Sequence, residues 1–139
     1  MPFHYEFISG YPIVVQTYAG KFDLAVLTDG FNIVTAQMRD MRGVVYMVID
    51  VLKAETTFAD MNAVLKQGDH LGERLPHLTD LRLLIVGTNE LAKFYVNAAR
   101  QKQFGGEQIP LFANVEDAIT AAKSAYERHG QTSDAPVTM

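Results

Sequence analysis

Near the middle of the chain stand six consecutive apolar residues, Val44-Val45-Tyr46-Met47-Val48-Ile49. Such a run is typical of a strand that is buried on both of its faces, as in a parallel sheet covered by helices. The run Leu81–Val86 has a similar character. Between the two runs, Thr57 is a good helix N-cap and is followed by apolar residues at helical spacing. The centre of the chain therefore predicts a strand–helix–strand unit.

The same alternation extends in both directions from this unit. Upstream, Phe3, Tyr5 and Phe7 alternate with polar residues, and a turn at Ser9–Pro12 leads to a second strand, which predicts an antiparallel hairpin. Downstream, an asparagine that suits a helix N-cap follows each of the last two predicted strands. The expected strands are 3–7, 13–18, 44–49, 81–86 and 109–113, and the expected helices are 23–41 and those that begin at Thr57, Asn89 and Asn114.

These elements predict one α/β domain in the order β-β-α-β-α-β-α-β-α. The strands are expected to form a single mixed, mostly parallel five-stranded sheet covered by four helices. Pro110 cannot donate a backbone hydrogen bond, so the last strand is expected at an edge of the sheet. The domain is expected to span residues 1–130, and the polar segment 131–139 is expected to be a flexible C-terminal tail.

In this order of elements the chain resembles the STAS superfamily, which includes the sporulation anti-sigma factor antagonists, and more closely a group of bacterial STAS-like proteins. Three stretches carry the resemblance, which extends over residues 3 to 126: Gln16–Gly20 before a long helix, Val44–Asp50 closed by an acid, and Leu83–Asn89 with Phe112–Ala118 downstream. The resemblance implies the STAS fold and a regulatory, signalling role exerted through partner proteins.

One departure concerns the phosphorylation switch that the resemblance implies. Anti-sigma factor antagonists carry an Asp-Ser-Ser-Gly-like stretch at the start of the second helix, where a partner kinase phosphorylates a serine. The corresponding stretch here, residues 50–58, reads DVLKAETTF and contains neither serine nor glycine. Thr56 and Thr57 are its only hydroxyl residues, and the sequence leaves open whether either of them is phosphorylated.

Composition excludes several classes of protein. The chain has 139 residues, 12 basic and 16 acidic side chains, a net charge of −4 and no cysteine. The lack of cysteine excludes disulfides, a thiol nucleophile and cysteine-ligated zinc, and the acidic balance argues against a general nucleic-acid binder. The N-terminus lacks the pattern of a signal peptide, and no apolar run approaches the roughly twenty residues of a membrane span. We therefore expect a cytoplasmic protein.

Polar side chains gather where the parallel strands are expected to end. In open α/β sheets this edge carries ligand sites, and helix N-termini add free amide donors there. Simple helix capping is the competing explanation, because Thr57, Asn89 and Asn114 are what any helix start requires. The residues predicted to form a contact surface are Lys53, Glu55, Thr56, Thr57, Phe58, Thr88, Asn89 and Lys93.

No complete catalytic set accompanies these residues. The four histidines are scattered along the chain, whereas a zinc site needs three or four converging ligands. We therefore predict a non-enzymatic regulatory domain, without cofactor or metal, that docks a partner protein or a second copy of itself on the helix rim. Val26 and Ile33 lie off the main apolar stripe of the first helix, which favours an additional surface for a homodimer or partner.

Two alternatives stay open. An enzyme that uses Asp50 or Glu55 as a base is one of them. The other is a carrier of small molecules or lipids, whose pocket the aromatic residues of the first half would line. Those residues are Phe3, Tyr5, Phe7, Tyr11, Tyr18, Phe22 and Phe31.

Overall fold

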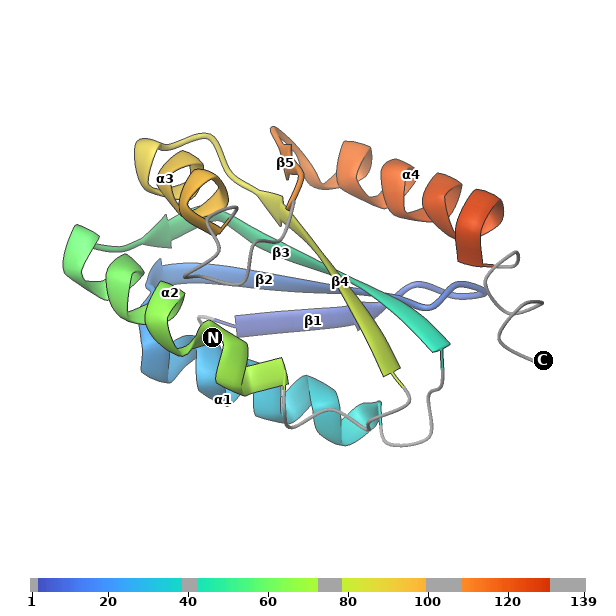
Figure 1. The fold of residues 1–139 in the computed structure, drawn as a ribbon, viewed down its shortest axis with the longest axis horizontal. Helices are drawn as coiled ribbons and strands as arrows, with labels where there is room; N and C mark the ends of the chain where they lie inside the picture. The colour runs from blue at the N-terminus through green and yellow to red at the C-terminus, as the bar shows by residue number, and fades with distance from the viewer. Residues whose placement is uncertain (1–2, 39–42, 73–78, 100–108, 131–139) are drawn as a thin grey trace.

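The computed structural model describes residues 3–38, 43–72, 79–99 and 109–130 (Figure 1). The strands are β1 (Phe3–Phe7), β2 (Ile13–Lys21), β3 (Gly43–Glu55), β4 (Thr79–Val86) and β5 (Leu111–Phe112). The helices are α1 (Leu24–Gln37), α2 (Phe58–Gly72), α3 (Glu90–Ala99) and α4 (Val115–Ala125), and α4 continues into a π-helical turn, Tyr126–Gly130. This order of elements is the one predicted from the sequence.

The strands form a single sheet in the order β1-β2-β3-β4-β5. β1 pairs antiparallel with β2, with Phe3 opposite Tyr18 and Phe7 opposite Val14. The pairs β2–β3, β3–β4 and β4–β5 are parallel. The predicted mixed, mostly parallel five-stranded sheet with an opening hairpin is therefore confirmed. The order of the strands, which the sequence left open, follows the order of the chain.

The sheet separates two apolar cores. Parallel crossovers are right-handed, and here they all advance in one direction, so α1, α2 and α3 lie on the same face. α4 follows the edge strand β5 and covers the opposite face (Figure 1). Side chains alternate accordingly along β2: Val14 and Tyr18 belong to the core under α1–α3, whereas Ile13 and Val15 belong to the core under α4.

Two polar side chains are buried in the core under α1–α3. Gln16 is fully buried and Tyr18 is only 1% exposed. The Tyr18 hydroxyl donates to Gln16 Oε1 at 2.7 Å. Gln16 Nε2 in turn donates to the Met47 sulfur at 3.1 Å. The buried polar groups thus satisfy one another. Burial also raises the pKa of the Tyr18 phenol well above its ordinary value.

Several element ends differ from the predictions. α1 ends at Gln37, with Met38 as its C-cap, rather than at residue 41. β3 does not end at Ile49 but continues to Glu55, because β2 runs beside it as far as Lys21. β5 is limited to residues 111–112 rather than 109–113. The predicted tail 131–139 lies outside the described residues.

Candidate functional site

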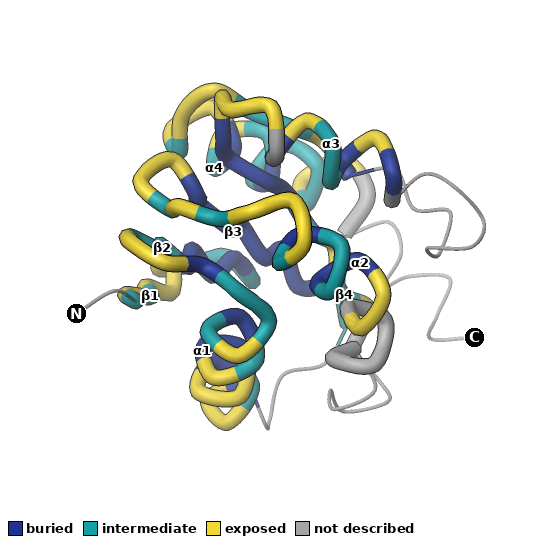
Figure 2. Tube along the Cα trace, turned by 90° about the vertical axis from the view of Figure 1, so that its left-hand side faces the viewer, coloured by how far each residue is buried: buried dark blue, intermediate teal, exposed yellow. Residues whose placement is uncertain are grey.

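The parallel strands end at one side of the sheet, but not at the same level. β4 last pairs with β3 at Val86, opposite Asp50. β3 runs on beside β2 until Glu55 lies opposite Lys21, and the Glu55 carbonyl accepts from the Phe22 amide at 2.8 Å. Lys53 and Glu55, expected in a loop, therefore belong to a strand that projects beyond β4. Figure 2 looks at this end of the molecule and shows the exposed end of β3.

A β-bulge marks the start of the projecting segment. Thr17 pairs with Asp50, but the next register pair joins Ala19 to Lys53, so β3 contains one more residue than β2 there. The Asp50 carboxylate accepts from the Leu52 backbone amide at 2.9 Å. Asp50 thus stabilises the local backbone. Leu52 is left 40% exposed.

The start of α2 confirms Thr57 as its N-cap. Thr57 Oγ1 accepts from the Asp60 amide at 3.1 Å, as in the first half of a capping box. The Thr56 hydroxyl donates to the Thr57 carbonyl at 3.5 Å. Thr57 is exposed and Thr56 is half-buried, so both threonines lie at the surface next to the projecting strand.

The start of α3 supplies the second half of the predicted surface. Asn89 Oδ1 accepts from the Ala92 amide at 2.7 Å, which confirms Asn89 as an N-cap. Lys93 Nζ lies 3.3 Å from a Glu90 carboxylate oxygen, with both side chains largely in solvent. Thr88, Asn89 and Lys93 are exposed, so the polar residues predicted here are accessible.

An aromatic pair joins the two halves. Phe58, at the first turn of α2, is 61% exposed. Its ring packs on that of Phe94 in α3, with centroids 4.8 Å apart and planes inclined by 43°. Phe94 is not among the residues predicted for the site; it is half-buried and also packs against the core under α1–α3. We call the following residues at this end the rim, of which Thr56 and Phe94 are half-buried and the others exposed: Lys53, Glu55, Thr56, Thr57, Phe58, Thr88, Asn89, Lys93 and Phe94.

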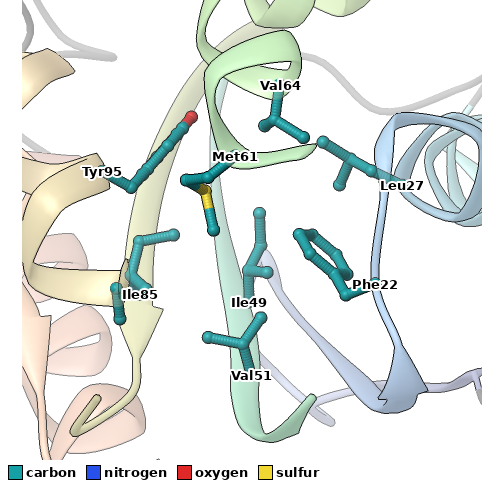
Figure 3. Close-up of a pocket in the computed structure, with 9 residues that line it drawn as sticks. Phe22, Leu27, Ile49, Val51, Met61, Val64, Ile85 and Tyr95 are labelled. Atoms are coloured by element: carbon teal, nitrogen blue, oxygen red, sulfur yellow. The ribbon is translucent and has the colours of Figure 1, made fainter. Parts of the chain in front are cut away.

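An apolar cavity of about 40 Å³ lies under α1, α2 and α3, against the sheet (Figure 3). Met61 and Val64 of α2 face Ile49 and Val51 of β3 across it. Of the seven aromatic residues expected to line a pocket, Phe22 does so; Phe3, Tyr5 and Tyr18 instead pack on one another. The lining residues are Phe22, Leu27, Ile49, Val51, Met61, Val64, Ile85, Ala92 and Tyr95.

Within the described ranges, no three histidine, aspartate or glutamate side chains lie close enough together to hold a metal ion. Among the helices that the structure describes, none has the length and apolar character needed to cross a bilayer.

A five-stranded mixed sheet with three helices on one face and a C-terminal helix on the other defines a SpoIIAA-like α/β fold, the fold predicted from the resemblance to STAS domains. The chain is similar to an anti-sigma factor antagonist from Mycobacterium paratuberculosis, with a TM-score of 0.54 and 18% identity over 87% of this chain and 92% of that one. It is also similar to an uncharacterized protein of the DUF3478 family with a SpoIIAA-like fold from Shewanella loihica PV-4. That TM-score is 0.55, with 17% identity over 86% and 91% of the two chains. No protein-family model and no curated protein matches the chain.

Proposed function

We propose that this chain is a cytoplasmic, non-enzymatic regulatory domain that docks a partner protein on the rim. The observation that carries the proposal is Phe58, a large aromatic side chain that is 61% exposed and packs on Phe94. The similarity in fold to an anti-sigma factor antagonist supports a regulatory role through protein interaction.

The chemistry of the rim resembles that of a protein interface. Interfaces place aromatic side chains at their centre and surround them with polar residues. Here Phe58 and Phe94 are flanked by the polar starts of α2 and α3 and by the charged end of β3, which carries Lys53 and Glu55. Because the Phe58 ring already packs on Phe94, docking would cost little additional side-chain entropy at Phe58.

The carboxylates at this end favour a structural role over catalysis. Asp50 is only 9% exposed, and one of its oxygens is engaged by the Leu52 amide. A general base must reach the proton that it abstracts, and a buried carboxylate committed to the backbone is poorly placed for that. We therefore propose no reaction for Asp50.

The cavity does not support the carrier alternative. Sites for small molecules typically enclose about 300–1,000 Å³, whereas this cavity measures about 40 Å³. Every lining residue except Tyr95 is buried. A lipid would therefore require a different arrangement of α1, α2 and α3, and we propose protein docking alone.

The experiment compares two exposed apolar side chains. Three tagged proteins are used to isolate bound proteins from cells of the organism that encodes the chain. They are the wild type and the variants Phe58→Ala and Ile33→Ala. Ile33 is 47% exposed and lies on α1, outside the rim. Bound polypeptides are identified by mass spectrometry, purified, and titrated against all three proteins by calorimetry.

The expected result is a partner that binds the wild type and Ile33→Ala with equal affinity. Phe58→Ala should bind it at least about tenfold more weakly, as is usual for an interface hot spot. Partners that bind Phe58→Ala as tightly as the wild type would show that the rim is not the docking surface.

A further inference from the structure

A second exposed apolar surface lies at the β1 edge, away from the rim. Phe7 at the end of β1 is 36% exposed, and Ile33 of α1 is 47% exposed. Ile33 follows Gly30 by three residues and so lies near it on the helix surface. A Cβ atom at Gly30 would stand 2.9 Å from the Phe3 ring, so this side of α1 faces β1. Phe7 and Ile33 therefore belong to the same edge of the molecule.

β1 is the outer strand of the sheet, and its pairing partner is β2. The side of β1 that faces away from β2 therefore presents backbone donors and acceptors that a further strand can pair with. Figure 2 shows β1 at the margin of the fold, with no described helix or strand beyond it.

The side chains of β1 divide by face. Phe3, Tyr5 and Phe7 form a continuous row of rings, with successive centroids 5.9 Å and 6.1 Å apart. His4 and Glu6 point to the other face, because side chains alternate along a strand, and both are exposed. The strand thus carries one base and one acid, placed symmetrically about Tyr5.

We propose that two copies of the chain associate by antiparallel pairing of their β1 strands about a two-fold axis at Tyr5. Pairing all five residues places His4 of each copy opposite Glu6 of the other, and Phe3 opposite Phe7 of the other. Each of these pairs occurs twice because the interface is two-fold symmetric. The histidine and the carboxylate form a donor–acceptor pair, and the two rows of rings become one.

Charge selects this register over its neighbours. A shift of two residues in one direction sets Glu6 opposite Glu6 of the second copy, which places like charges directly across from each other. The opposite shift sets His4 against His4 and separates Glu6 from the histidine of the second copy. The fully paired register is therefore the complementary one. The rim lies outside this interface, so the dimer would present two docking surfaces.

The test is the oligomeric state of the full chain, measured by sedimentation velocity over a range of concentrations. We expect a reversible dimer for the wild type. Glu6→Lys removes the carboxylate acceptor from both symmetric pairs and should weaken dimerisation about tenfold or more. The double variant His4→Glu/Glu6→Lys restores opposite charges across the axis and should restore dimerisation. Circular dichroism checks that each variant is folded.

Phe58→Ala is the matched control, because it alters the rim and leaves the β1 edge intact. It should dimerise like the wild type, so failure of this proposal and failure of rim docking are distinguishable. A wild-type protein that stays monomeric up to about 1 mM, which excludes a dissociation constant in the micromolar range, would overturn the proposal. So would a dimer that Glu6→Lys leaves unchanged, or one that Phe58→Ala dissociates.

Discussion

The Tyr18 hydroxyl lies directly against the backbone of Gly30, where β2 passes under α1. A Cβ atom at Gly30 would overlap that hydroxyl and would also stand 2.9 Å from the Phe3 ring. Glycine inside a helix normally costs about 1 kcal/mol relative to alanine. The cost is accepted here because the volume that an alanine methyl needs is already occupied by Tyr18.

Gly30→Ala is therefore expected to destabilise the protein, although alanine is the better helix former. Overpacking in a closed core costs about 1–3 kcal/mol, which outweighs the gain of about 1 kcal/mol in helix propensity. Urea unfolding measures the difference in unfolding free energy. In the Tyr18→Phe background the nearest clashing atom is absent, so Gly30→Ala should cost less there. A Gly30→Ala protein more stable than the wild type would contradict the packing described.

Tyr18→Phe on its own should also destabilise the protein. It removes the donor to Gln16 Oε1, which is fully buried and makes a 2.7 Å hydrogen bond in the native state. An unsatisfied buried acceptor costs about 1–3 kcal/mol. Adding Gln16→Met removes the orphaned acceptor and should recover part of the loss, as measured by the same unfolding experiment. Equal stabilities of Tyr18→Phe and the wild type would rule out this role for the hydrogen bond.

The Tyr18 phenol should also make the unfolding free energy depend on pH in the alkaline range. Burial raises the pKa of Tyr18 above its ordinary value of about 10, so the native state favours the neutral form. The resulting stability is complete below pH about 10 and is lost as the pH rises further, because the unfolded chain releases the proton first. Denaturant unfolding between pH 8 and pH 11 should show a steeper decline for the wild type than for Tyr18→Phe. Parallel curves would show that Tyr18 does not contribute.

Features set by residues close in sequence could be predicted, whereas features set by contacts between distant parts of the chain could not. The N-caps Thr57, Asn89 and Asn114 were predictable because each bonds an amide three residues away. The length of β3 was not, because its last residues are held by β2 rather than by an apolar run of their own. Helical spacing places Phe94 on the buried side of α3, and Phe94 does pack against the core. Spacing alone does not show that the exposed Phe58 lies beside it.

Asp50 offers a test of the bulge at the base of the rim. Asp50→Ala removes the acceptor of the Leu52 amide and should cost about 1 kcal/mol of unfolding free energy. Asp50→Asn keeps a side-chain oxygen in place and should cost less. Both variants should keep their affinity for a rim partner within a few-fold if Asp50 acts only on the backbone. A similar, large loss of stability for both would indicate that the negative charge itself is required.

The cavity makes the last prediction, since space that is empty in the native state can be filled. Val64→Ile adds one methyl group at its wall. Filling a void of about 40 Å³, at roughly 24 cal/mol per Å³, limits the gain in unfolding free energy to about 1 kcal/mol.

Val48→Ile is the matched control, because Val48 is fully buried in the core under α4. This variant should lose about 1–3 kcal/mol of unfolding free energy from overpacking. Val64→Ile should raise the unfolding free energy while leaving rim docking unchanged, because Val64 is buried and is not a rim residue. If Val64→Ile loses as much stability as Val48→Ile, the void cannot accept a methyl group. If it gains stability but loses partner binding, the cavity takes part in docking, and the rim alone does not account for the interaction.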